Sequence, residues 1–100
     1  MEYIELRRIV LLSTQKALLG MIYPEIRAIG VGFENKDKFT IVCYLDREPN
    51  EDDYEILSDV TGEILSDIDF LEVEEKCVFS NETFLNLETL DSWVYKRKEN

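Results

Sequence analysis

The sequence contains no histidine among its 100 residues. Histidine is the usual general base, a common metal ligand and the partner of most nucleophilic serines and cysteines, so its absence removes the main routes to catalysis. The carboxylates that remain lie on a predicted solvated helix face or at turns, where water surrounds them. The sequence therefore predicts that the protein is not an enzyme. An enzyme that works with carboxylates alone is the alternative, and it would need an acid in a pocket.

Cysteine is also scarce, and only Cys43 and Cys77 occur. Both lie in apolar, strand-like runs without the CxxC spacing or the neighbouring soft ligands of a zinc site. We expect both thiols to be reduced and buried, with a disulfide between neighbouring strands as the alternative. No EF-hand spacing accompanies the acidic clusters, and Gly30 and Gly32 lack the third glycine of a phosphate-binding loop. The sequence predicts no metal and no cofactor, and we expect these glycines to give a helix room to approach a sheet.

Long hydrophobic runs are missing as well. The longest uncharged apolar run, Ile9 to Gln15, is too short to cross a bilayer. The first residues carry Glu2 and Glu5 and lack the order of charged, apolar and small residues that marks a signal peptide. With 45% hydrophobic residues, the chain can bury a core, so we expect one globular domain over residues 1–100, located in the cytoplasm.

Positive charge is absent from one long stretch. Between Glu48 and Glu75, twelve Asp and Glu residues occur without a single Lys or Arg. The other acids nearly balance the 11 Lys and Arg, so the net charge of −11 comes from this stretch. The negative electrostatic field of such a stretch repels nucleic acid and anionic membranes. It attracts a basic protein surface, and this attraction weakens as the salt concentration rises. The sequence predicts a basic protein partner, and neither nucleic acid nor a membrane.

The remaining residues follow a regular order of helices and strands. A helix is predicted from about Glu2 to Leu19, before Gly20, with its apolar rows pressed across a sheet. One of these rows holds Leu6, Val10 and Ala17, and the other holds Ile9, Leu12 and Leu19. A second helix is predicted from the N-cap Asn50 to about Asp67. Strands are predicted over 26–33, 39–45, 70–80 and 93–95, with a helical turn between the last two.

The order α-β-β-α-β-β predicts an α+β fold, in which two helices pack on one face of a mixed four-stranded sheet. The second helix should cross over to join the second and third strands in parallel, whereas hairpins at both ends should be antiparallel. The other face of the sheet is either covered by residues 81–91 or available to a partner.

Helical periodicity places the acids of the second helix opposite its apolar side. The carboxylates expected to bind a partner are Asp52, Glu55, Asp59, Glu63, Asp67 and, beyond the helix, Glu72. Several of them repel one another at i,i+4 spacing, which favours a docking surface over the alternative of a merely solvated face. The aromatic residues expected to anchor the partner are Tyr54, Trp93 and Tyr95, with core packing as the alternative for each.

The run ALLGMIYPEIRAIGVGF, followed by FTIVCYLDREPNEDDYEILSDVTGEILSDI, resembles small acidic bacterial immunity proteins of contact-dependent growth inhibition systems. The likeness covers about Ala17 to Ile68. It implies a cytosolic antidote that binds the toxic domain of a secreted effector, often a nuclease, and blocks its substrate site. It carries over no functional residue by position. The alternative is a structural or adaptor protein that forms an apolar, salt-insensitive homodimer through a bare sheet face.

Overall fold

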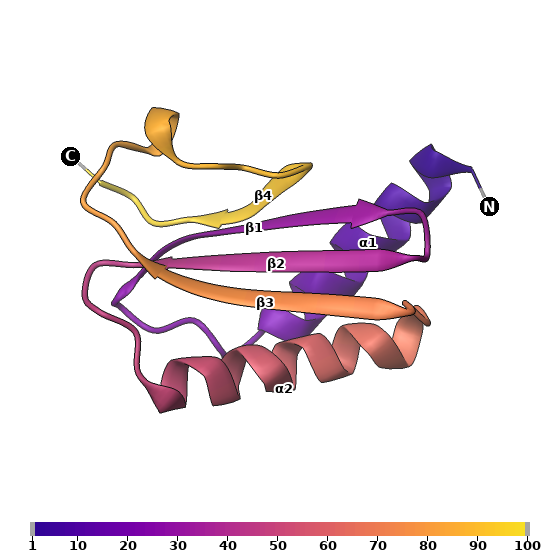
Figure 1. Ribbon diagram of the computed structural model, residues 1–100, viewed down its shortest axis with the longest axis horizontal. Coiled ribbons are helices and arrows are strands. Elements are labelled where there is room, and N and C mark those ends of the chain that lie inside the picture. Colours follow the sequence, from indigo (N-terminus) through magenta and orange to yellow (C-terminus); the bar gives the residue numbers. More distant parts are fainter. Residues whose placement is uncertain (1, 100) are drawn as a thin grey trace.

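The computed structural model describes residues 2–99 (Figure 1). Its elements follow the predicted order and form an α+β fold. They are α1 (Tyr3–Leu18), β1 (Ile26–Glu34), β2 (Lys38–Leu45), α2 (Glu51–Asp67), β3 (Glu72–Phe79), the single 3-10 turn η1 (Phe84–Asn86) and β4 (Ser92–Lys96). Among these residues, no helix combines the length and the apolar character needed to span a membrane.

The four strands form one mixed sheet in the order β3-β2-β1-β4. β1 and β2 form the predicted antiparallel hairpin, and α2 provides the predicted crossover to a parallel β3. β4 pairs antiparallel with β1, so β3 and β4 lie at opposite edges. The antiparallel hairpin predicted for the last two strands is therefore wrong. Figure 1 shows the reason, since the segment that joins them is long enough to cross the sheet and reach the free edge of β1.

Both helices cover one face of the sheet, which we call the inner face. Alternate strand residues such as Ile29, Phe39 and Ile41 form one core cluster with Val10 of α1 and Ile64 of α2. All five are essentially inaccessible to water. Burial of apolar surface is the main favourable term in folding, so this cluster holds the helices on the sheet.

The opposite, outer face is covered at its centre by the segment that joins β3 to β4. Val42 and Tyr44 are buried there beneath Phe84 and Trp93, and the Tyr44 hydroxyl donates to the backbone oxygen of Glu88 at 2.8 Å. Of the two predicted alternatives for this face, coverage by residues 81–91 is confirmed.

A buried arginine fastens the chain beyond β4 to β1. Arg27 is 6% exposed, and its Nε and Nη2 donate to the two carboxylate oxygens of Glu99 at 2.9 and 2.8 Å. Its Nη1 donates to the backbone oxygen of Ser80 at 2.8 Å, and its guanidinium lies 5.1 Å from the Phe84 ring centroid. The hydrogen bonds from Arg27 hold the pKa of Glu99 at about 2, well below its ordinary value.

α1 buries only one of the two apolar rows predicted to face the sheet. Val10 lies in the inner core as expected, but Leu12 is 58% exposed and Leu19 is 79% exposed, so the prediction for their row is wrong. Ser13 and Thr14 are buried instead. A buried hydroxyl is tolerated when it is hydrogen-bonded, and Thr14 donates to the backbone oxygen of Val10 at 2.7 Å.

Two glycines of β1 make room for the segment that covers the outer face. A Cβ on Gly30 would lie 2.5 Å from the backbone oxygen of Thr89, and one on Gly32 would lie 3.0 Å from the Cβ of Leu90. The prediction that these glycines admit a helix is therefore wrong. They admit the chain that leads into β4, which is an equally close approach by a different neighbour.

Replacing Gly30 by alanine is expected to lower the free energy of unfolding by about 1–3 kcal/mol, because the new methyl group overlaps a backbone oxygen that cannot rotate away. Gly32→Ala should cost less, since its nearest neighbour is a side-chain atom at 3.0 Å. Urea unfolding of both variants measures the difference. Equal losses would contradict the close approach of residue 89 to β1.

Candidate partner-binding surface

α2 begins at a capping box. The Asn50 side chain accepts a hydrogen bond from the backbone N–H of Asp53 at 3.2 Å, and the Asp53 carboxylate accepts one from the N–H of Asn50 at 2.8 Å. These bonds satisfy donors that the start of a helix leaves unpaired. They also determine where the first turn lies, and hence which side of α2 each later residue occupies.

Asp53 anchors α2 to the preceding chain. Its side chain is 2% exposed, and it accepts two hydrogen bonds from Arg47 at 2.7 and 3.0 Å and one from the Tyr23 hydroxyl at 2.6 Å. The Arg47 bonds lower the pKa of Asp53 to about 2, while burial and the Asp53 bond raise the pKa of Tyr23. Asp53 is the third residue after the N-cap Asn50, in the first turn of α2. The structure makes it a buried structural carboxylate.

Four carboxylates occupy the outward side of α2, and we call them the acidic face: Asp52, Glu55, Asp59 and Glu63. Their spacing of three or four residues keeps them on one side of the helix. All four residues are exposed, and across residues 2–99 none of their carboxylates takes part in a salt bridge or a hydrogen bond. The acidic face is therefore open to water and to a partner.

The other two predicted carboxylates are Asp67, which lies beside Glu63 at the margin of the acidic face, and Glu72, which lies on the sheet. Asp67 accepts a hydrogen bond from Ser13 of α1 at 2.7 Å and lies 3.5 Å from the Lys16 ammonium. The Ser13 bond, together with the charge of Lys16, lowers the pKa of Asp67. Glu72 opens β3 in register with Lys38, and both side chains point to the outer face, away from α2.

The fold separates the three predicted aromatic anchors. Tyr54 lies on α2, is 43% exposed, and its hydroxyl donates to the backbone oxygen of Cys77 at 3.4 Å. Trp93 packs on the outer face, edge-on to Tyr44 with ring centroids 5.9 Å apart, and Tyr95 packs against the inner core. Of the three, Tyr54 alone shares α2 with the acidic face.

α1 also reaches this surface, contrary to the prediction that its apolar rows face the sheet. Leu12 was assigned to the core, yet it is exposed beside Lys16 and Asp67, where α1 meets α2. A signal was present in the sequence. α1 carries two apolar rows, and a helix lying on a sheet can bury only part of its circumference, so one row had to remain outside.

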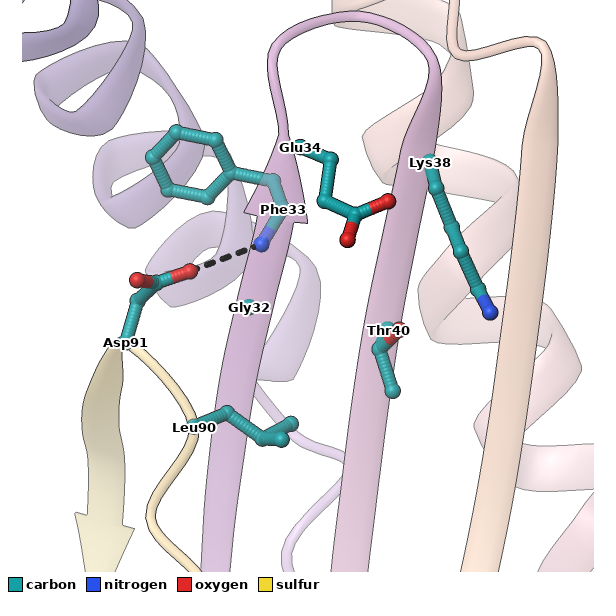
Figure 2. A pocket seen from close by; sticks show the side chains of 7 residues that line it. All are labelled: Gly32, Phe33, Glu34, Lys38, Thr40, Leu90 and Asp91. Carbon is teal, nitrogen blue, oxygen red and sulfur yellow. Dashed lines mark hydrogen bonds between the residues drawn. The ribbon is translucent and has the colours of Figure 1, made fainter.

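A hollow of about 340 Å³ lies on the outer face beside the β1–β2 turn (Figure 2). Figure 2 shows Asp91 accepting a hydrogen bond from the backbone N–H of Phe33, at 2.9 Å. Lys38, on the other side of the hollow, pairs with Glu74 at 3.3 Å. These charged groups serve to hold the sheet together, so the hollow adds nothing to the acidic face.

The two cysteines face each other in register on β2 and β3, and both are free and buried. Burial raises the pKa of Cys43 to about 12 and that of Cys77 to about 11, which keeps the thiols protonated and unreactive. Throughout residues 2–99, no three His, Cys, Asp or Glu side chains are grouped so that they could hold a metal ion.

Residues 7–99 match the family of the MafI2 immunity protein. The chain belongs to this family. The match extends from α1 through β4 and is thus wider than the resemblance noted over residues 17–68. No curated protein sequence matches the chain. Membership of the MafI2 immunity protein family indicates the role of an immunity protein with a protein toxin as its partner, and such a role is non-enzymatic.

Proposed function

We propose that this MafI2 immunity protein neutralises a basic, nuclease-type toxin domain by docking the acidic face of α2 onto it. The observation that carries the proposal is the row of exposed carboxylates without partners in the described chain. Glu55, Asp59 and Glu63 repel one another at i,i+4 spacing by a few tenths of a kcal/mol per pair, roughly. A basic partner would replace this repulsion with attraction.

A helix of carboxylates suits a nuclease because nucleases present Lys and Arg to the phosphate backbone. Carboxylates at fixed helical spacing can accept paired hydrogen bonds from arginine, which are the strongest contacts of this kind. Cations held in this way are unavailable to nucleic acid, so the bound helix would block the substrate site. Tyr54, on the same helix, is 43% exposed and would add an aromatic contact at the edge of the docked surface.

We further infer that the protein meets its toxin in the cytoplasm. The net charge of −11 keeps it away from nucleic acid and anionic membranes. Buried free thiols are typical of a reducing compartment. The resemblance to immunity proteins of contact-dependent growth inhibition supports a toxin delivered by a neighbouring cell.

Affinity capture from a bacterial lysate tests the proposal. The tagged chain, washed at about 0.15 M salt, should retain one basic domain that cleaves nucleic acid and loses this activity when the chain is added in equal amount. Exposed charges are screened beyond about 8 Å at this ionic strength, so several-fold more salt should slow association. Capture of a toxin domain without a basic surface, or an association rate that salt leaves unchanged, would refute the docking proposal and leave the immunity role in place.

Self-association is a second candidate, favoured by one apolar surface. A hollow of about 350 Å³ at the C-terminal end of α1 is lined mainly by Leu18, Leu19, Ile22, Val94 and Tyr95. A second copy seated there would form a salt-resistant homodimer with a structural or adaptor role. If capture returned only the chain itself, as a dimer that sediments identically at low and high salt, this candidate would replace the first.

A further inference from the structure

A groove runs between α1 and α2, where Figure 1 shows the two helices approaching each other. It consists of two hollows, of about 330 and 190 Å³, which share Ser13, Lys16 and Asp67 as lining residues. α1 contributes the apolar Ile9 and Leu12 to one hollow and the exposed Lys16 to both. α2 contributes Glu63 and Ser66 to the other hollow.

The floor of this groove is held in place by hydrogen bonding. Ser13 is 4% exposed and donates to Oδ2 of Asp67 at 2.7 Å, and the Lys16 ammonium lies 3.5 Å from the same oxygen. The two helices are thereby tied together where they cross. The groove is open without any movement of the helices, so a partner that enters it need not spend binding energy on forming it.

Leu12 gives the groove an apolar contact next to the acidic face. It is 58% exposed, and Ile9 beside it is partly buried against the inner core. One exposed leucine is ordinary on a protein surface. Leu12, however, lines one of the two joined hollows and Glu63 lines the other. Tight interfaces combine an apolar contact with nearby charges, because a buried apolar contact excludes water from the charge pairs around it.

We infer that this groove holds a segment of the toxin domain in which an apolar side chain is flanked by Lys or Arg. The inference rests on the proposed function and specifies the part of the toxin that docks. The apolar side chain fills the hollow beside Leu12, while the flanking cations pair with Glu63 and Asp59. A second copy of the chain does not fit, because a two-fold interface would bring the two acidic faces together.

The variant Leu12→Glu distinguishes insertion of an apolar side chain into the groove from a purely electrostatic contact. The new carboxylate adds negative charge next to the acidic face, so a purely electrostatic contact with a basic domain would be unchanged or tighter. Insertion of an apolar side chain predicts the opposite, a rise in Kd of about tenfold or more. The probe is the purified toxin domain recovered by the capture experiment, titrated by calorimetry. Leu12→Gln, which adds no charge, serves as a second variant and should weaken binding in the same direction.

Leu85→Glu is the matched control, because Leu85 is 96% exposed on η1, on the outer side of the sheet. Its Kd should stay within about twofold of the original chain, and thermal unfolding should show all the variants folded. If Leu85→Glu weakened toxin binding as much as Leu12→Glu does, the proposal that the groove binds the toxin would be wrong.

The remaining outcomes separate this inference from the function on which it rests. If both Leu12 variants bind normally while reversal of the charges on α2 abolishes binding, the groove does not bind the toxin, and binding through the acidic face is supported. If neither change affects binding, the proposal that the acidic face binds the toxin is wrong as well. If no toxin domain is captured, both proposals fail.

Discussion

Changing Glu55, Asp59 and Glu63 together to lysine is expected to raise the Kd for the toxin domain at least about 100-fold. Each substitution replaces an attraction to a basic surface with a repulsion, and like charges across an interface cost several kcal/mol. The chain should remain folded, because all three residues are exposed and lie opposite the buried side of α2. Calorimetric titration measures the affinity, and far-ultraviolet circular dichroism with thermal unfolding checks the fold.

The control for this variant changes Glu5, Glu82 and Glu88 to lysine. These residues are exposed and lie on α1 and on the segment that joins β3 to β4, so the net charge changes equally while α2 is untouched. The control should bind within a few-fold of the original chain. An equal loss in both variants would point to overall charge, and unaltered binding by the α2 variant would remove this helix from the interface.

Asp53→Ala is expected to lower the free energy of unfolding by about 3–4 kcal/mol, the largest effect on stability among these changes. The substitution removes the acceptor for two Arg47 bonds and for the Tyr23 hydroxyl, and it also breaks the capping box with Asn50. Part of the cost is the Tyr23 hydroxyl left without its partner in a half-buried site. Urea unfolding at neutral pH measures the change, and Asp52→Ala is the exposed neighbour, expected to cost less than about 1 kcal/mol.

The contribution of Asp53 should also depend on pH with a definite sign. Its pKa in the folded protein is about 2, against an ordinary value of 3.8. A lowered pKa means that the stabilisation is fully present above about pH 5 and is lost as the pH falls toward 2. The stability difference between the original chain and Asp53→Ala should therefore narrow between about pH 4 and pH 2. A constant difference over this range would show that the ionised carboxylate is not what stabilises the start of α2.

The elements that sequence reasoning located correctly are those with local signals. Pro49 and Asn50 mark the start of α2, and alternation of side chains marks β1 and β2 on either side of a short charged turn. The parallel pairing of β2 with β3 follows from the helix between them, because a helical crossover returns the chain to the end of the sheet where β2 began. Each of these signals lies in consecutive elements of the chain and requires no knowledge of distant neighbours.

The features that sequence reasoning missed depend on distant partners. β4 could pair with β3 or with β1, and the choice depends on how residues 81–91 pack over Val42 and Tyr44. The buried row of α1 includes Ser13, whose hydroxyl is satisfied by Asp67, 54 residues later in the chain. Hydrophobicity alone ranks Leu12 above Ser13 for burial, and the structure reverses that order.

The acidic face was the predictable part of the candidate site, because helical periodicity alone places Asp52, Glu55, Asp59 and Glu63 on the outward side of α2. Periodicity could not show that Asp67 is tied to α1, nor that Trp93 and Glu72 lie on the outer side of the sheet. The groove beside Leu12 arises only where α1 and α2 meet, so no single segment of sequence encodes it.

The place of β4 has a consequence for protein synthesis. β1 lies inside the sheet, yet its second neighbour is the last strand, and its Arg27 is fastened to Glu99. While the ribosome is still making residues before β4, the nascent chain carries an unpaired strand edge that invites aggregation or engagement by chaperones. A chain interrupted before this point would possess α2 with all its carboxylates but an incomplete sheet behind it. The acidic face is therefore backed by a complete sheet only in chains translated through Glu99.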